Sequence, residues 1–157
     1  HRDLHSFLHD ALPIFGRLKI ISKSGVLPEY KSSGAAGFDI GAFIEKDFSL
    51  APGCRTLIPT GLYFEIPSGY EAQIRARSGL AINHGIEVVN GIGTVDSDYR
   101  GEIKVPLINW SDEEFTIRNG DRIAQVVIAE AKQVTIRSVD ELSDSERGTG
   151  GFGHTGI

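Results

Sequence analysis

Turn signals built from proline and glycine recur every seven or eight residues in the first half of the chain. They are Pro52-Gly53, Pro59-Thr60-Gly61 and Pro67-Ser68-Gly69. Short runs rich in apolar residues lie around them, at 48–50, 55–58, 62–66 and 70–76. Short runs separated by tight turns are typical of antiparallel β-structure. The pattern therefore predicts an all-β fold, and 19 glycines and 6 prolines in 157 residues agree with it.

Further strands are expected at 18–22, 102–109 and 115–117, with a buried strand at 123–129. The strand pattern is interrupted once, at 77–85, where one short helix is expected. Ser78 is its expected N-cap, residues 80–84 its body and Gly85 its left-handed end. Free N–H groups at the start of a helix beside Arg77 suit a phosphate, although the cap could equally be structural.

Within residues 90–103, two carboxylates, a tyrosine and an arginine lie between Gly93 and Gly101. We predict a hairpin that presents these groups. Backbone atoms at Gly91 and Gly93 could bond a planar polar ring directly, and Tyr99 offers a flat face for packing. On residue types alone, an ordinary surface turn is the commoner explanation of a Gly-x-Gly sequence.

A single aspartate interrupts the apolar segment at 36–42. In an extended chain Phe38, Ile40 and Ala42 share one face, and Asp39 faces the opposite way. Its carboxylate is therefore expected in solvent or in a site.

Residues 1–16 do not share the strand pattern, and we interpret them as a non-native or disordered N-terminal extension. The chain contains no methionine, which indicates a fragment or a processed product. His1, His5 and His9 would stack on one face of a helix. A metal site is one interpretation, and a tail with chance histidines is the other, favoured because no further ligand completes a set.

Residues 145–157 form a glycine-rich end, whose start overlaps an acidic stretch at 140–146 that is typical of a solvated linker. Residues 148–153 match Gly-x-Gly-x-x-Gly, but no strand–helix unit follows, so a dinucleotide site is not expected. By composition this end could be disordered. Flexible glycine around Arg147 and Phe152 also suits a closing lid, which is our interpretation.

Net charge and cysteine content restrict the partners and the compartment. A formal charge of −5 argues against a nucleic-acid partner, which requires excess lysine and arginine. No apolar run approaches the roughly 20 residues that span a bilayer, so no membrane partner is expected. The single Cys54 is compatible with a reducing compartment, and we expect a cytoplasmic protein.

Five segments, in order, resemble the motifs of the trimeric dUTPases. They are residues 36–42, 77–81, 93–103, 120–125 and 147–156. Two departures are Ile92, where proline is frequent, and His154, where serine is common. The resemblance implies a β-domain over residues 17–144, folded as a distorted jelly roll with one short helix. It also implies a homotrimer with shared active sites and hydrolysis of dUTP to dUMP and pyrophosphate. Such an enzyme limits uracil incorporation into DNA and supplies dUMP for dTMP synthesis.

The resemblance also implies residue roles. Asp96 would deprotonate the water that attacks the α-phosphorus, and Asp39 would hold a hydrated Mg²⁺ on the triphosphate. Tyr99 would pack on the deoxyribose and exclude a ribose. Gln125 would meet the α-phosphate, Arg147 the γ-phosphate, and Phe152 would stack on uracil. The complete set of implied substrate-binding residues is Arg77, Ser78, Gly79, Asn90, Gly93, Thr94, Tyr99, Gln125, Arg147, Phe152, Gly153 and His154.

Two rival functions stay open at this point. The related dCTP deaminases share the fold but are not expected to combine Tyr99-Arg100-Gly101 with the tail at 150–153. A non-catalytic binding module on the same scaffold would be favoured by loss of Asp96 or Arg147, and both residues are present.

Overall fold

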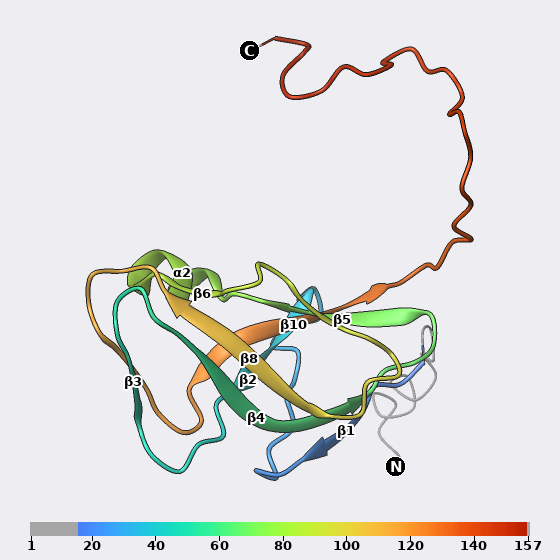
Figure 1. Ribbon diagram of the computed structural model, residues 1–157. Coiled ribbons are helices and arrows are strands. Elements are labelled where there is room, and N and C mark those ends of the chain that lie inside the picture. Colours follow the sequence, from blue (N-terminus) through green and yellow to red (C-terminus); the bar gives the residue numbers. More distant parts are fainter. Residues whose placement is uncertain (1–15, 157) are drawn as a thin grey trace.

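The computed structural model describes residues 16–156, and strands dominate it, with a single helix among the described residues. Figure 1 shows the arrangement. The elements in chain order are β1 (Lys19–Ser22), β2 (Gly37–Gly41), β3 (Phe48–Leu50), β4 (Arg55–Glu65), β5 (Tyr70–Arg75), α2 (Ser78–His84), β6 (Ile86–Val88), β7 (Gly93–Val95), β8 (Glu102–Asn109), β9 (Phe115–Ile117) and β10 (Arg122–Glu130). The expected all-β fold with one short helix is confirmed.

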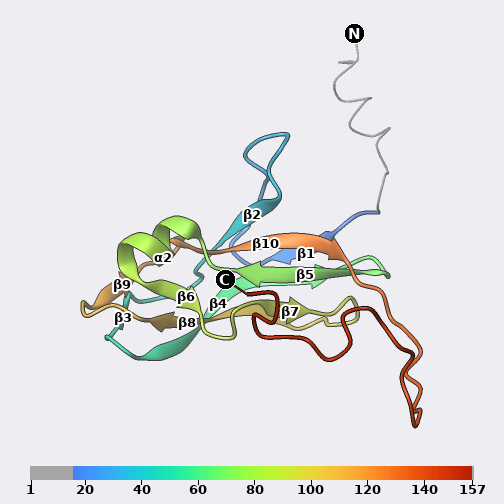
Figure 2. The ribbon, with the colours of Figure 1, turned by 90° about the horizontal axis from the view of Figure 1, so that it is seen from above.

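Two four-stranded antiparallel sheets share one core. Their strand orders are β1-β4-β8-β6 and β2-β10-β5-β7, and β3 and β9 form a separate ribbon. Figure 2 shows the strands of both sheets from above. Phe38 of β2 and Phe64 of β4 meet edge to face, with ring centroids 6.4 Å apart, so the sheets pack through their apolar faces.

Strand β2 alternates as the sequence predicts. Phe38 and Ile40 are buried in the core, as is Ala42 just beyond the strand. Asp39 is only partly buried and faces outward. Because successive side chains of a strand point to opposite faces, the same packing that buries Phe38 and Ile40 presents the Asp39 carboxylate on the outer face of its sheet.

The turn predicted at Pro59-Thr60-Gly61 is wrong, because these residues lie inside the continuous strand β4. The pairing with β8 shifts between Pro59 and Leu62, so Thr60 and Gly61 form a bulge. Gly61 has φ 68°, and the Thr60 hydroxyl donates a hydrogen bond of 2.5 Å to the Ile103 carbonyl oxygen. A bulge accommodates proline and glycine. Because both residues also favour turns, their presence alone cannot distinguish a bulge from a chain reversal.

The hairpin predicted at 90–103 is also wrong. β7 pairs with β5 in one sheet, whereas β8 pairs with β4 and β6 in the other. The intervening residues 96–101 therefore cross between sheets. Local turn chemistry predicts that the chain bends here, but the partner of each strand depends on distant residues.

The N-cap of helix α2 (Ser78–His84) lies one residue before the expected one. Arg77 is the N-cap, with φ −85° and ψ 131° and no side-chain capping bond, so the expected N-cap role of Ser78 is wrong. Gly85 ends the helix in the left-handed conformation, as predicted. A Cβ at Gly85 would lie 2.9 Å from the backbone nitrogen of Ser111, so close packing also requires glycine there.

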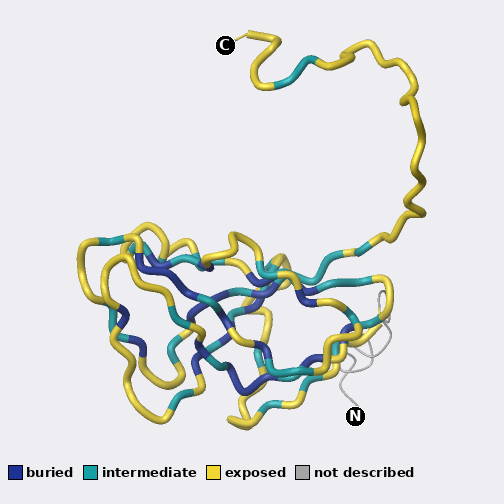
Figure 3. The backbone as a smooth tube through the Cα atoms, viewed as in Figure 1, coloured by how far each residue is buried: buried dark blue, intermediate teal, exposed yellow. Residues whose placement is uncertain are grey.

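Beyond β10, residues 131–156 contain no helix or strand and are largely exposed. Figures 1 and 3 show this arm leaving the sheets and then bending back at a distance from them. Phe152 is fully exposed. Residues 1–15 and 157 lie outside the described residues, and with them the histidines His1, His5 and His9 and nearly all of the expected N-terminal extension.

Candidate functional site

Charged side chains from three elements meet on the outer face of the β2-β10-β5 sheet. Asp39 lies between two arginines: its Oδ1 is 3.2 Å from Arg77 Nε and its Oδ2 is 3.4 Å from Arg122 Nη1. Two guanidinium groups against one carboxylate leave a net positive charge there, which suits an anionic ligand. We call Asp39, Arg77, Arg122 and Gln125 the arginine cluster.

Backbone contacts hold this cluster in place. Arg77 Nη1 donates to the Arg122 carbonyl oxygen at 3.0 Å, and Gln125 Nε2 donates to the Ala76 carbonyl oxygen at 2.9 Å. A Cβ at Gly37 would lie 3.1 Å from Gln125 Oε1, so this amide lies over a glycine. Ser78 and Gly79 follow Arg77 and are exposed beside it. The structure thus brings together Asp39, Gln125 and the 77–79 segment.

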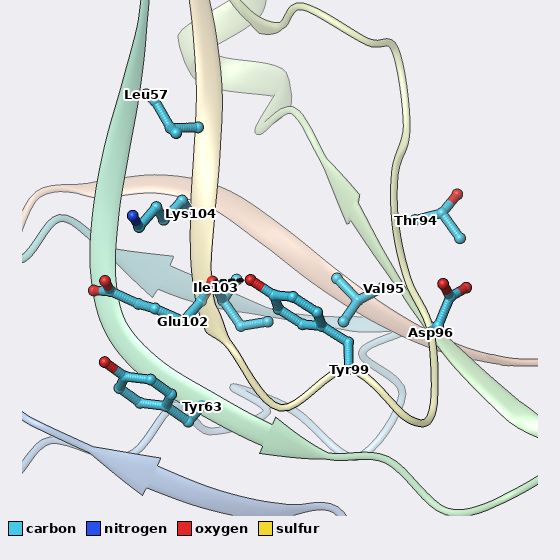
Figure 4. A pocket seen from close by; sticks show the side chains of 9 residues that line it. All are labelled: Leu57, Tyr63, Thr94, Val95, Asp96, Tyr99, Glu102, Ile103 and Lys104. Carbon is cyan, nitrogen blue, oxygen red and sulfur yellow. Dashed lines mark hydrogen bonds between the residues drawn. The ribbon is translucent and has the colours of Figure 1, made fainter.

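A second group of predicted residues surrounds a pocket of about 530 Å³ on another part of the molecule. Its lining residues are Leu57, Tyr63, Thr94, Val95, Asp96, Tyr99, Glu102, Ile103 and Lys104. Figure 4 shows Asp96 and Thr94 on one side, Glu102 and Lys104 on the other, and the Tyr99 ring between them. We call this the tyrosine pocket. It offers a carboxylate, a cation and an aromatic face within one concave surface.

Four contacts fix the tyrosine and the strand end beside it. The Tyr99 hydroxyl donates to the Glu102 carbonyl oxygen at 3.0 Å, and its backbone nitrogen donates to the Asp96 carbonyl oxygen at 3.2 Å. The ring lies against Gly101, where a Cβ would be 2.6 Å from Tyr99 Cζ. The Glu102 carboxylate accepts a 3.0 Å bond from the Gly61 nitrogen, which ties this end of β8 to the bulge in β4.

Asn90 and Gly93 stand at the entry to β7. Asn90 is exposed, Gly91 has φ 77°, and a Cβ at Gly93 would meet the Ile74 side chain at 3.2 Å. A larger residue there would require the Ile74 side chain to shift by a few tenths of an ångström, so glycine favours the close approach of this strand to β5. Thr94 follows on the pocket wall, so the 90–94 segment leads directly into the tyrosine pocket.

The two groups do not meet within one chain. Asp39 is on β2 and Asp96 follows β7, and these strands are the opposite edges of one sheet. Three strand spacings separate the edges, roughly 14 Å. Along the strands, Asp39 aligns through Gln125 with Arg75, whereas Val95 aligns with Ala72, a further offset of about 10 Å. One water molecule or one phosphate cannot contact both aspartates.

The tail residues form a third group. Arg147 Nε donates to the Gly150 carbonyl oxygen at 2.6 Å, so its contact is within the arm. The His154 ring lies against Gly150, and Phe152 and Gly153 adopt positive φ of 51° and 83°. All of these lie on the exposed arm, away from both other groups (Figure 1).

Sequence reasoning missed the part of the pocket wall that β4 and β8 supply. Glu102 and Lys104 alternate with the buried Ile103 and Val105, so strand alternation could have placed both on the outer face. The same alternation places Tyr63 on the outer face between the buried Leu62 and Phe64, whereas Leu57 carries no comparable signal. Arg122 is not among the expected substrate-binding residues, and its ion pair with Asp39 places it in the arginine cluster.

Two kinds of feature are absent from residues 16–156. No group of three or more His, Cys, Asp or Glu side chains among them could hold a metal ion. No helix in that part of the chain is long and apolar enough to cross a membrane.

Comparisons with known proteins agree with the fold. The dUTPase family model matches residues 23–156. The deoxyuridine 5'-triphosphate nucleotidohydrolase of Treponema denticola is 57% identical over 146 residues, covering 93% of this chain and 99% of that protein. The one from Finegoldia magna is 52% identical over 141 residues, covering 89% and 99%. A solved dUTPase mutant of Staphylococcus bacteriophage 80alpha with dUpNHpp has a TM-score of 0.77 at 26% identity, covering 90% of this chain and 99% of that one.

Proposed function

The chain belongs to the dUTPase family, and from this premise we propose that it hydrolyses dUTP to dUMP and pyrophosphate. The Treponema and Finegoldia relatives are deoxyuridine 5'-triphosphate nucleotidohydrolases. The observation that carries the proposal is the tyrosine pocket, in which the Asp96 carboxylate and the Tyr99 ring line one cavity. A carboxylate can take a proton from water and the face of a ring can pack against a sugar, so this pocket offers both a general base and a contact for the deoxyribose.

Asp96 is the proposed general base. It is exposed, on a loop that begins where β7 ends. An ionised carboxylate in this position can orient a water molecule and take its proton as the oxygen attacks the α-phosphorus. General-base assistance of this kind contributes about 10²- to 10⁴-fold to turnover.

The arginine cluster is the proposed phosphate subsite. Arg77 and Arg122 supply positive charge, and Ser78, Gly79 and Gln125 supply neutral hydrogen-bonding groups beside it. As negative charge moves onto the leaving pyrophosphate, fixed donors of this kind stabilise it without reorganisation. Arg77 is the main anion-binding group in this proposal, because only 28% of its side chain is exposed and its position is fixed.

A magnesium ion fits this arrangement only as a partner of the substrate. Both oxygens of Asp39 already face guanidinium groups, and the described residues offer no cluster of three candidate ligands. Magnesium typically keeps several waters and binds substrate phosphates. Bound in that way, it would neutralise phosphate charge, with Asp39 reaching it through water.

The tyrosine pocket is the proposed site of base and sugar selection. Tyr99 is held at both its hydroxyl and its backbone nitrogen, so its ring cannot easily retreat from a ribose 2′-hydroxyl. Backbone groups near Gly91 and Gly93, with Asn90 and Thr94 beside them, would meet the uracil edge. Specificity then depends on exclusion as well as on attraction.

We propose that the active site is completed by assembly into a homotrimer. The separation of Asp96 from the arginine cluster within one chain supports this, because the water and the phosphates must be held together. The arm would close over a neighbouring chain's site, with Arg147 on the γ-phosphate and Phe152 on uracil. Gly153 and His154 would contact the substrate alongside them. An exposed, glycine-rich segment can reach a neighbour at little cost in strain.

We propose a cellular role as well. Removing dUTP would limit uracil incorporation into DNA, and the dUMP released would supply dTMP synthesis. A cytoplasmic location is proposed on the single Cys54, which is exposed and unpaired in the structure. The proposed partners are dUTP and further copies of the chain, with no nucleic-acid partner, because the net charge is −5.

A nucleotide panel tests the function. The purified chain would be incubated with dUTP, dCTP, UTP and dTTP, and both pyrophosphate and ammonia would be measured. We expect pyrophosphate from dUTP and very little from UTP. Ammonia from dCTP would instead indicate a deaminase, and binding of dUTP without any product would indicate a non-catalytic module.

A further inference from the structure

The side chain of Arg100 spans the turn that carries Asp96 and Tyr99. Its Nη1 donates to the Ser97 carbonyl oxygen at 2.7 Å and to the Tyr99 carbonyl oxygen at 3.3 Å. Both acceptors belong to residues 96–101, the segment that crosses between the two sheets. One guanidinium group thus joins two carbonyls on either side of the bend.

The second terminal nitrogen of the Arg100 guanidinium group contacts a residue outside the turn. Arg100 Nη2 lies 3.6 Å from Oε1 of Glu65, the last residue of β4. The second oxygen of Glu65 lies 3.1 Å from Lys19 Nζ on β1. Lys19, and to a smaller extent Arg100, hold the pKa of Glu65 below its usual value. Glu65 is therefore an ionised anchor at neutral pH.

Few other contacts fix the position of Asp96. Residues 96–101 pair with neither sheet, and the turn is closed by the 3.2 Å bond from the Tyr99 nitrogen to the Asp96 carbonyl oxygen. Gly101, next in the chain, permits wide backbone motion. A rigid planar fork that meets carbonyls and a carboxylate together restricts such a turn more than a single contact could.

We propose that Arg100 is a positioning residue: anchored by Glu65, it holds the turn so that Asp96 and Tyr99 face the tyrosine pocket in the geometry the reaction needs. The inference rests on the proposed function. Exposed ion pairs of this kind add little to stability, and the side chains of Arg100 and Glu65 are 55% and 46% exposed. The contribution of Arg100 is therefore to the alignment of the reacting groups rather than to folding.

The first test compares Arg100→Ala with the intact chain, using kcat and KM for dUTP and the thermal unfolding midpoint. We expect kcat to fall roughly 10- to 100-fold, because small displacements of a reacting group are costly. The midpoint should move by less than about 4 °C. Lys19→Ala is the matched control: it removes the other partner of Glu65, leaves the turn contacts in place and should keep kcat unchanged.

The second test separates positioning from a general structural role. Free guanidinium ion at millimolar concentration should restore part of kcat in Arg100→Ala and none in Asp96→Asn. Glu65→Gln should lower kcat less than Arg100→Ala, because the two carbonyl contacts remain. Arg100→Lys should be intermediate, because an ammonium group cannot supply the planar fork.

Several outcomes would overturn the inference. Normal kcat in Arg100→Ala is one, and a fall in kcat matched by a collapse of the unfolding midpoint is another. Unchanged kcat with a raised dissociation constant for a non-hydrolysable dUTP analogue would make Arg100 a substrate-binding residue instead. An intact chain that leaves dUTP unhydrolysed would overturn the proposed function itself, and this inference with it.

Discussion

Replacing Asp96 by asparagine removes the proposed base and changes little else. Within residues 16–156 the Asp96 side chain has no hydrogen bond or ion pair, and its backbone carbonyl oxygen, which accepts from the Tyr99 nitrogen, is unaffected by the substitution. Asparagine is nearly the same size and keeps one acceptor oxygen. Since the substitution is at an exposed position without a partner, it should change the free energy of unfolding by no more than about 0.5 kcal/mol.

The effect on catalysis should be far larger. An amide cannot take a proton from water at neutral pH, so kcat should fall by at least about 10²-fold, which corresponds to roughly 2.7 kcal/mol of activation free energy. Tyr99 and the arginine cluster are untouched, so the dissociation constant of a non-hydrolysable dUTP analogue should change much less.

Pyrophosphate release under saturating dUTP and calorimetric titration with the analogue would measure the two quantities separately. Ser97→Ala, next along the loop, is a control for disturbance of the turn, because its backbone contact to Arg100 is retained. Near-normal turnover in Asp96→Asn would refute the general-base role. An equal loss of turnover and of analogue binding would mean that Asp96 mainly holds substrate.

Three further changes probe the arm, the N-terminal residues and the tyrosine. Removal of residues 147–157 should leave a folded oligomer with severely reduced turnover, measured by circular dichroism and pyrophosphate release, and an unfolded product would show that the arm is structural. Deletion of residues 1–16 should leave turnover and oligomer mass unchanged, because none of them belongs to a motif; a large loss of either would contradict this. Gly101→Ala should displace the Tyr99 ring, since a Cβ would lie 2.6 Å from its Cζ, and lower kcat/KM for dUTP by roughly 10-fold. Gly34→Ala, at a position with open space, is its control, and equal kinetics in the two variants would contradict the packing role.

Much of the fold could be predicted from local pattern. Alternation placed Asp39 opposite Phe38 and Ile40, and the glycine at 85 marked the end of the helix, because both depend only on near neighbours. Pro59-Thr60-Gly61 was misinterpreted because a bulge and a turn use the same residue types. The strands on either side of residues 96–101 pair in different sheets. The partner of each strand depends on contacts with distant residues, which no local sequence pattern contains.

The sequence indicated which residues belong to the candidate site. It did not indicate how those residues are arranged in space. Arg77 and Gln125 do lie together, because β5 and β10 are neighbours in one sheet. Asp96 lies beyond the opposite edge of that sheet from Asp39, although both were expected to serve one substrate. Arg100 lay inside the segment that resembled a motif, yet its contacts with Ser97 and Glu65 appear only in the folded chain.

The divided site can be tested most directly by mixing two inactive variants. Asp96→Asn lacks the base and Arg77→Ala lacks the main phosphate-binding arginine, and each alone should be nearly inactive. We propose that each site takes Asp96 from one chain and Arg77 from another. When equal amounts of the two variants assemble at random, half of the sites receive an intact Asp96, and half receive an intact Arg77. About one quarter of the sites (one half times one half) should then be functional.

The measurement is pyrophosphate release from dUTP after the two variants are unfolded together and refolded, with co-assembly verified by mass. Arg77→Ala mixed with Gln125→Ala is the control: both residues belong to the arginine cluster of one chain, so mixing should restore nothing. Recovery to about one quarter of the intact activity is the predicted result, since mixed oligomers rebuild complete sites. No recovery in verified mixed oligomers would show that each chain builds its own site, and would contradict an active site shared between chains.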